Sequence, residues 1–258
     1  MKISAKKISA TVASCALTAG LMFTMSPASA ATISTQPAQT NSAEVQSKFE
    51  ADDLAYIKSS FKNLQIPADK QEALLQKIAT GKQLDSDTGK KPVRIDTTTN
   101  TDGSQTVTSR WADGSATSTS EFPDKGPLAP SSIGGFPVAS PASVTGCTNK
   151  YEVGMTHKNG CKIWHQAVTW SAGFTSSFRY SLSNGNYIKS ISNPMTGGIG
   201  MGSGKLSYIK RSALSSQTAK AQLKARQKVN IGPIPTSRDV GVVLSVSRAG
   251  GSTSSFGA

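Results

Sequence analysis

Histidine, cysteine and acidic residues are scarce in this chain of 258 residues, and each scarcity narrows the possible functions. Two histidines and three cysteines supply few groups for proton transfer near neutral pH or for binding soft metal ions. From residue 145 onward the acidic residues are Glu152 and Asp239, so no other carboxylate pair is available there for glycoside hydrolysis. We therefore expect a binding protein without a cofactor rather than an enzyme.

A secreted hydrolase is the catalytic alternative. Its candidate base is His165, between aromatic residues on a predicted strand, with Asp239 or Glu152 to orient it and a serine as nucleophile. No nucleophile-elbow sequence accompanies these residues, and a hydrogen-bonded structural histidine is the simpler interpretation. His165, Asp239 and Glu152 are kept as catalytic candidates for this alternative alone.

The N-terminus predicts export. Three lysines precede an apolar run over residues 8–25, and small residues follow up to Ala30, which is the pattern of a signal peptide spanning residues 1–30. A transmembrane anchor is one alternative, but an 18-residue run with several Ala, Ser and Thr is marginal for crossing a bilayer. A lipoprotein site at Cys15 is another, disfavoured because the chain stays apolar beyond it. We expect a secreted, extracellular protein without a transmembrane anchor.

Export would leave Cys147 and Cys161 as the cysteines of the mature chain. In an oxidising compartment an isolated pair is expected to form a disulfide, here around 13 intervening residues. The same cysteines with His157 and His165 offer four ligands for zinc as an alternative. Their spacing matches no familiar zinc finger, so we expect the disulfide.

Asp85, Asp87 and Asp102 suggest calcium as a second metal hypothesis, because all three lie in predicted loops. The glycine and the terminal Glu of an EF-hand loop are absent from this stretch. Aspartates in turns also cap backbone amides. We favour this turn chemistry and expect no metal.

Charge is distributed unevenly between the two halves of the chain. Residues 31–144 carry 11 basic and 13 acidic residues, whereas the chain from residue 145 onward carries 14 basic and two acidic ones. Such asymmetry indicates an acidic partner for the basic half, for example a wall polymer, lipid head groups, an acidic polysaccharide or nucleic acid. Plain solubility is the alternative.

Residues 219–231 alternate between apolar and cationic side chains. Period two predicts a half-buried strand, although the Ala, Leu, Lys and Arg content would also suit a helix. Aromatic residues are sparse nearby, so we expect recognition of phosphate-like groups rather than of bases. The predicted binding residues are Lys205, Lys210, Arg211, Lys220, Lys224, Arg226 and Lys228.

The first half predicts a disordered lead at residues 31–48 and a small α+β domain at residues 49–122. Apolar periodicity predicts helices over 50–63 and 67–80. Asp-Gly turns then separate three strands of a meander, whose side carrying Val93 and Ile95 should be covered by the helices. The predicted strands are 93–99, 105–111 and 115–122.

The second half begins after a Pro-rich linker at residues 123–146. Residues 147–258 contain six or seven strand patterns separated by turn signals, which is typical of an antiparallel β-sandwich or jelly roll. The fold class is therefore mainly β, with this domain behind the small α+β domain. The predicted strands are 161–171, 174–183, 187–192, 206–211, 219–231, 240–247 and 252–256.

Residues 81–89, residues 111–115 and the start at Gly146 and Cys147 resemble uncharacterised secreted proteins of Gram-positive, mostly actinobacterial, bacteria. The resemblance covers the chain from Leu54 onward in outline and is specific in its first half. This sequence differs from those proteins in being far more basic after Lys205. The resemblance implies secretion and a two-part layout, but no activity.

These patterns together predict a secreted, non-catalytic protein whose cationic sheet face associates with an anionic cell-wall polymer or another extracellular polyanion. A secreted antibacterial or toxin-like protein with an N-terminal pro-region is the alternative from another class. Cleavage in the linker at 123–146, releasing a basic fragment, would favour that alternative. Nothing in these patterns indicates an oligomeric state.

Overall fold

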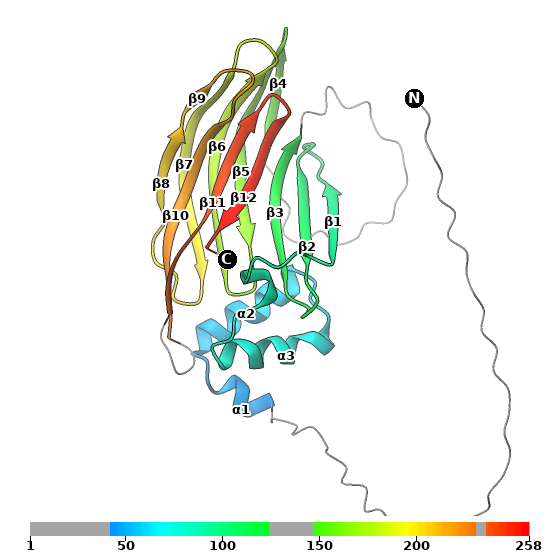
Figure 1. The fold of residues 1–258 in the computed structure, drawn as a ribbon, viewed down its shortest axis with the longest axis vertical. Coiled ribbons are helices and arrows are strands. Elements are labelled where there is room, and N and C mark those ends of the chain that lie inside the picture. The colour runs from blue at the N-terminus through cyan, green and yellow to red at the C-terminus, as the bar shows by residue number, and fades with distance from the viewer. Residues whose placement is uncertain (1–41, 124–146, 231–235, 258) are drawn as a thin grey trace, which may run out of the picture. The chain divides into compact units, whose positions relative to one another are not determined.

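The computed structural model describes residues 42–123, 147–230 and 236–257, which belong to one compact unit, Thr40–Ala258. The predicted fold class is confirmed: the unit is mainly β, with antiparallel strands in a nearly closed, sandwich-like arrangement and three α-helices in its N-terminal region (Figure 1). The predicted signal peptide and nearly all of the predicted Pro-rich linker lie outside the described residues.

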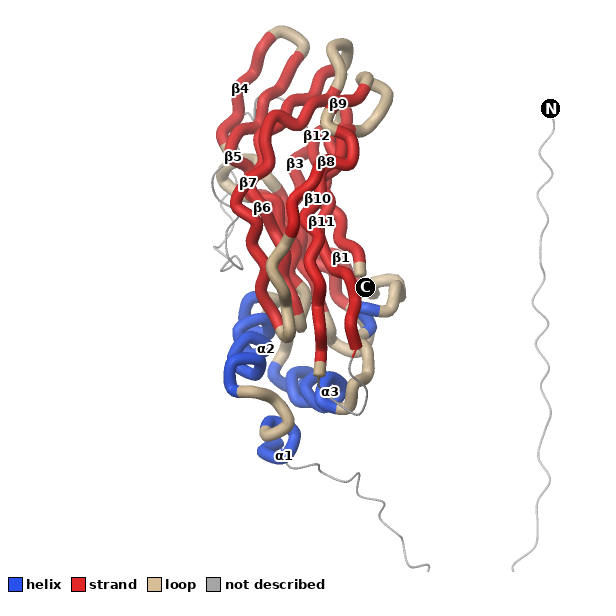
Figure 2. Tube along the Cα trace, turned by 90° about the vertical axis from the view of Figure 1, so that its left-hand side faces the viewer, coloured by secondary structure: helices blue, strands red, loops and turns tan. Residues whose placement is uncertain are grey.

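The two predicted helices are present as α2 (Ala51–Asn63) and α3 (Ala68–Ala79). Their apolar residues recur at helical spacing and are buried, including Ile57, Phe61 and Leu74. Figure 2 shows these helices at one end of the strands. No helix in the described part of the chain is long and apolar enough to cross a membrane.

The predicted disordered lead is partly wrong. Residues within it form a short helix, α1 (Ser42–Gln46), which packs against α3. The side chain of Val45 is only 3% exposed and belongs to the apolar cluster beneath the helices. Burial of this single aliphatic side chain in a polar stretch explains why local composition did not reveal the helix. A 3₁₀ turn, η1 (Asp85–Asp87), follows α3.

The predicted meander is present as β1 (Arg94–Thr99), β2 (Gln105–Arg110) and β3 (Ala116–Pro123). The expected buried side is wrong, because Val93 is 69% and Ile95 is 60% exposed. Ala116, Ser118, Ser120 and Phe122 of β3 face inward instead, and β2 follows the register of β3, so that Thr106 and Thr108 are buried.

The remaining strands include the seven predicted ones and two that were missed, β4 and β9. Most begin or end a few residues from the predicted boundaries. They are β4 (Thr148–Glu152), β5 (Met155–Gln166), β6 (Trp170–Ser181), β7 (Asn186–Gly198), β8 (Lys205–Lys210), β9 (Ser212–Ala213), β10 (Ala219–Val229), β11 (Thr236–Ser247) and β12 (Gly250–Phe256).

Strand order explains how the sheet closes on itself. Hydrogen-bonded neighbours follow the order β8-β10-β11-β12-β3-β5-β6-β7-β9. The elements at the two ends of this order, β8 and β9, are separated in sequence by Arg211 alone. One stretch of chain therefore pairs first with β10 and then with β7. Nε and Nη2 of Arg211 stabilise this switch by donating to the carbonyl oxygens of Ile188 and Lys189 at 3.3 and 2.9 Å.

The parts predicted as two domains share this sheet. Thr119 of β3 pairs with His165 of β5, and Phe122 of β3 pairs with Gly251 of β12. The Oγ of Ser120 also accepts a hydrogen bond of 3.0 Å from the amide of Trp164. The meander is thus an integral part of the sheet formed by the basic half, within one compact unit.

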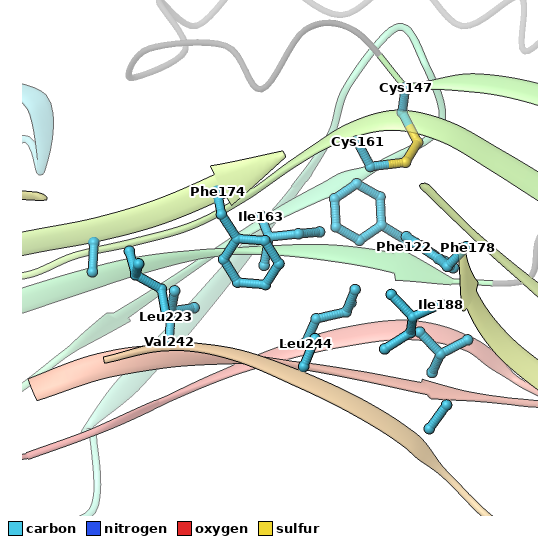
Figure 3. Packing of buried hydrophobic residues seen from close by; sticks show 14 of the residues in the cluster. Phe122, Cys147, Cys161, Ile163, Phe174, Phe178, Ile188, Leu223, Val242 and Leu244 are labelled. Atoms are coloured by element: carbon cyan, nitrogen blue, oxygen red, sulfur yellow. A yellow bond between two sulfur atoms is a disulfide. The ribbon is translucent and has the colours of Figure 1, made fainter. Parts of the chain in front are cut away.

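Two apolar clusters stabilise the unit. The larger one fills the space enclosed by the strands, where the rings of Phe122 and Phe178 meet edge to face at 5.8 Å (Figure 3). The smaller cluster joins the helices to Val168 and Ile199. The predicted disulfide is confirmed between Cys147 and Cys161, beside the larger cluster, and the chain-entropy account gives it about 3 kcal/mol.

Candidate functional site

The alternating segment is the strand β10, as period two predicted. Its Ala and Leu side chains, such as Leu223, point into the core, whereas Lys220, Lys224, Arg226 and Lys228 are exposed. The helix alternative is therefore wrong. Because the apolar side chains are anchored by burial, the cations are held on the outward side of the sheet.

Cations lie directly opposite one another across β8 and β10. Lys205 is the cross-strand partner of Lys224, and Lys210 is the partner of Lys220. Directly opposed side chains share one face with Cβ atoms about 5 Å apart, and like charges in this position are destabilising. All four side chains are exposed, so solvent limits the cost. We call the exposed side chains of Lys205, Lys210, Lys220, Lys224, Arg226 and Lys228 the cationic face.

One carboxylate, Asp239 of β11, lies against this face. Its carboxylate forms ion pairs with Nζ of Lys224 at 2.8 Å and with Nη1 of Arg226 at 3.4 Å. The hydrogen bond from Lys224 is the main reason why the pKa of Asp239 is lowered. Within the described ranges, the other four cations of the face have no acidic partner. The face therefore keeps a clear excess of positive charge.

Arg211 differs from the other predicted binding residues. Its guanidinium donates to the backbone of β7 and lies 5.4 Å from the ring centroid of Tyr187 and 5.0 Å from that of Tyr208. Cation–π contacts and carbonyl acceptors account for this position. We therefore assign Arg211 to closure of the sheet rather than to the cationic face.

The catalytic candidates have separate environments. His165 on β5 is 3% exposed, its ring centroid lies 4.7 Å from that of Trp170, and burial lowers its pKa to about 3. Glu152 forms an ion pair with Lys150 at 3.0 Å, and its carboxylate lies 3.4 Å from Nε2 of His157. Asp239 is occupied on the cationic face. A histidine held neutral by burial, with each acid paired elsewhere, provides no assembled triad.

The metal hypotheses also find their residues otherwise engaged. The sulfur atoms of Cys147 and Cys161, which the zinc hypothesis would use as ligands, are bonded to each other. Asp85 pairs with Lys77 and Lys90, Asp87 with Arg238, and Asp102 accepts hydrogen bonds from the turn residue Ser104. No group of three or more His, Cys, Asp or Glu side chains suited to a metal ion occurs in the described part of the chain.

Sequence reasoning missed a buried polar network that contains Gln227. This residue has the apolar parity of β10 and is fully buried. Its amide nitrogen donates to the carbonyl of Ile199 at 3.1 Å, and its Oε1 accepts from Arg238 at 3.0 Å. Arg238 in turn donates a hydrogen bond of 3.3 Å to the carboxylate of Asp87. Burial raises the pKa of Asp87, although the positive charge of Arg238 acts in the opposite direction. The single Gln among the apolar positions of β10 was the available signal.

A cavity of about 290 Å³ lies where α2 meets β5, β6 and β7. Tyr56, Trp164 and Met195 line it together with several polar side chains. Four elements contribute, so no local pattern in the sequence could have revealed it. Its volume lies at the lower limit for small-molecule pockets, and we assign no ligand to it.

Comparison with known proteins adds no relative. No protein-family model, curated protein or solved structure matches this chain. The resemblance to secreted actinobacterial proteins therefore stays a prediction, and the functional argument depends on the geometry of the cationic face.

Proposed function

We propose that this is a secreted, non-catalytic protein whose cationic face binds an anionic polymer of the cell envelope or the extracellular space. The observation that carries this proposal is the opposition of lysines across β8 and β10, Lys205 to Lys224 and Lys210 to Lys220. A sheet under selection for stability alone would pair opposite charges at such positions. A polyanion lying over the face would supply the missing negative charge.

Strand geometry suits a repeating ligand. Neighbouring strands are about 5 Å apart, and every second residue along a strand is displaced by about 7 Å. The lysines and Arg226 thus form a two-dimensional array of donors, which a polymer with regularly spaced phosphates or carboxylates can contact at several points. Single exposed ion pairs contribute little, so we expect affinity to depend on many contacts and to fall with salt.

The disulfide supports an oxidising location, which agrees with export. The pro-region alternative receives less support, because release of the basic half would separate β3 from β5 and β12. Phe122, fully buried in the larger core, would leave with β3. The N-terminal half therefore acts as part of the scaffold in this proposal.

The test compares binding to isolated Gram-positive cell walls over a series of salt concentrations. The first variant replaces Lys220, Lys224, Arg226 and Lys228 with Gln. The matched control replaces four exposed lysines outside the face, Lys48, Lys58, Lys62 and Lys91, with Gln and removes the same charge. We expect tight, salt-sensitive binding by the unmodified protein and the control, and at least about a tenfold loss in the first variant.

Equal loss in the two variants would show that net charge, rather than the cationic face, governs binding. Equal binding by all three proteins would contradict the proposal. Circular dichroism spectra should be alike for the three, and all three should unfold cooperatively, because every replaced side chain is exposed.

A further inference from the structure

Three turns at the end of the sheet remote from α2 and α3 expose aliphatic side chains. Val153 in the turn between β4 and β5 is 104% exposed, Leu182 between β6 and β7 is 74% exposed, and Leu214 between β9 and β10 is 69% exposed. Figure 1 places β4 and β9 at this end. We call Val153, Leu182 and Leu214 the aliphatic tip.

Hydrogen bonds hold the three turns together as one surface. The Oγ of Ser181 donates to the carbonyl of Gly154 at 2.6 Å and accepts from the amide of Asn184 at 3.0 Å. The Nδ2 of Asn186 donates to the carbonyls of Leu214 at 3.2 Å and Gln217 at 2.7 Å. The first pair of bonds ties the β4–β5 turn to the β6–β7 turn, and the second ties the latter to the β9–β10 turn. The aliphatic tip is therefore positioned by the fold.

Close packing reinforces this arrangement at one glycine. Gly185 has φ +80°, and a Cβ at this position would lie 2.6 Å from the carbonyl oxygen of Ala213. The β6–β7 turn thus approaches the backbone beside Leu214 more closely than any other residue type would permit. Leu182 and Leu214 are displayed by neighbouring, tightly packed turns rather than by independent loops.

Positive charge surrounds the aliphatic tip. Exposed cations occur near the start of β7, at the end of β8, at the start of β10 and in the β11–β12 turn: Lys189, Lys210, Lys220 and Arg248. Glu152 immediately precedes Val153 in the sequence, and its carboxylate is already paired with Lys150 at 3.0 Å. The arrangement is complementary to an anionic bilayer, because the aliphatic tip could enter the acyl region while the cations behind it contact the anionic head groups.

We propose that the aliphatic tip docks this protein on an anionic lipid bilayer, with Val153, Leu182 and Leu214 inserted among the lipids and the surrounding cations at the head groups. Turn tips are convex, and a fluid acyl layer accommodates them without a matching pocket. Tyr151, 44% exposed on β4, is suited to the interface between head groups and water. This surface is separate from the middle of the cationic face and does not require the proposed polymer binding.

The first experiment measures flotation of the unit Thr40–Ala258 with lipid vesicles. This unit contains both apolar clusters and omits the apolar run at residues 8–25, which would bind lipid by itself. Vesicles are phosphatidylcholine alone or an equal mixture with phosphatidylglycerol. We expect binding to the mixture and about a hundredfold lower partition coefficient when Val153, Leu182 and Leu214 are all replaced by Ser.

The matched control replaces Ile95 of β1 and Val93, which immediately precedes β1, by Ser; both side chains are similarly exposed. It should bind the mixed vesicles like the unmodified unit. The Ser variant of the tip should still bind cell walls, whereas the Gln variant of the cationic face should lose this binding. Failure of one proposal is therefore distinguishable from failure of the other. Equal flotation of the tip variant and the unmodified unit would overturn the docking proposal.

Insertion is measured with Leu214→Trp and, as a control, Ile95→Trp. On mixed vesicles containing brominated lipid we expect additional quenching of the new tryptophan in Leu214→Trp and none in Ile95→Trp. Flotation without such quenching would overturn insertion. Lack of flotation, together with self-association that the Ser variant of the tip abolishes, would assign this surface to contact between copies of the chain instead.

Discussion

Cations have opposite environments in two regions of the molecule. Near the ends of the helices, each of Lys77 and Arg238 contacts a carboxylate, Asp113 at 2.7 Å and Asp87 at 3.3 Å respectively. On the cationic face, lysines instead lie opposite lysines. The first arrangement joins segments distant in sequence and stabilises the fold. In the second, the opposed lysines do not stabilise each other, which is why we assign this face a ligand.

The helix-end network also shows how acids are used in this protein. Asp113 accepts from Lys77, from the amide of Asp85 at 2.8 Å and from the amide of Ser115 at 2.9 Å. Burial alone would raise the pKa of Asp113, but the bonds from Lys77 and Ser115 outweigh it and lower the pKa to about 2. Asp113 thus has a structural role, whereas the lysines of the cationic face are left exposed.

The largest effect should follow removal of a cation from the buried network. Arg238→Ala leaves the carboxylate of Asp87, which is 6% exposed, without its partner and removes a donor from Gln227. We expect a loss of about 3 kcal/mol in the free energy of unfolding, measured by urea denaturation. Arg94→Ala breaks an exposed ion pair with Asp96, which solvent screens, and should cost much less. Equal losses of stability in Arg238→Ala and Arg94→Ala would contradict the distinction between the buried and the exposed ion pair.

An intermediate effect should appear as a dependence of stability on pH. The pKa of Asp113 is lower in the folded than in the unfolded chain, so its contribution is present above about pH 4 and disappears as the pH falls toward about 2. Relative to Asp113→Asn, the unmodified protein should therefore be more stable by about 1 to 2 kcal/mol near neutrality, with the difference shrinking in acid. A difference that is constant over this range of pH would contradict the assigned role of the carboxylate.

The smallest effect should be a gain in stability on the cationic face. Lys205→Gln removes the like charge opposite Lys224, and we expect the free energy of unfolding to rise by about 0.5 kcal/mol at low salt. Binding to cell walls should fall in the same variant. Lys62→Gln on α2 removes an exposed lysine away from the face and should change neither quantity. A loss of stability in Lys205→Gln would indicate that the lysine has a structural role.

Local patterns were sufficient for much of the fold. The alternation over residues 219–231 predicted β10 and its exposed cations, and apolar spacing predicted α2 and α3 to within a residue or two. The isolated cysteine pair predicted the disulfide. Each of these features depends on the order of polar and apolar residues in a short stretch, or on two residues of a rare type.

Features that depend on pairing between distant strands were not accessible in the same way. The meander displays Val93 and Ile95 because β3 pairs with β5 and β12, which turns its Ser-rich side inward. Arg211 was assigned to binding because its charge was visible in the sequence, whereas its acceptors on β7 were not. The register of a strand, and the partners of a long side chain, are set by segments far away in the sequence.

The sequence by itself determined the mainly β class, the paired cysteines and the excess of positive charge in the second half, because composition and short-range periodicity follow from the residues alone. Only the tertiary structure decided that lysines face lysines across β8 and β10, that the meander belongs to the same sheet, and that Val153, Leu182 and Leu214 lie at one end. These facts depend on strand order and register, which result from the burial of both apolar clusters together.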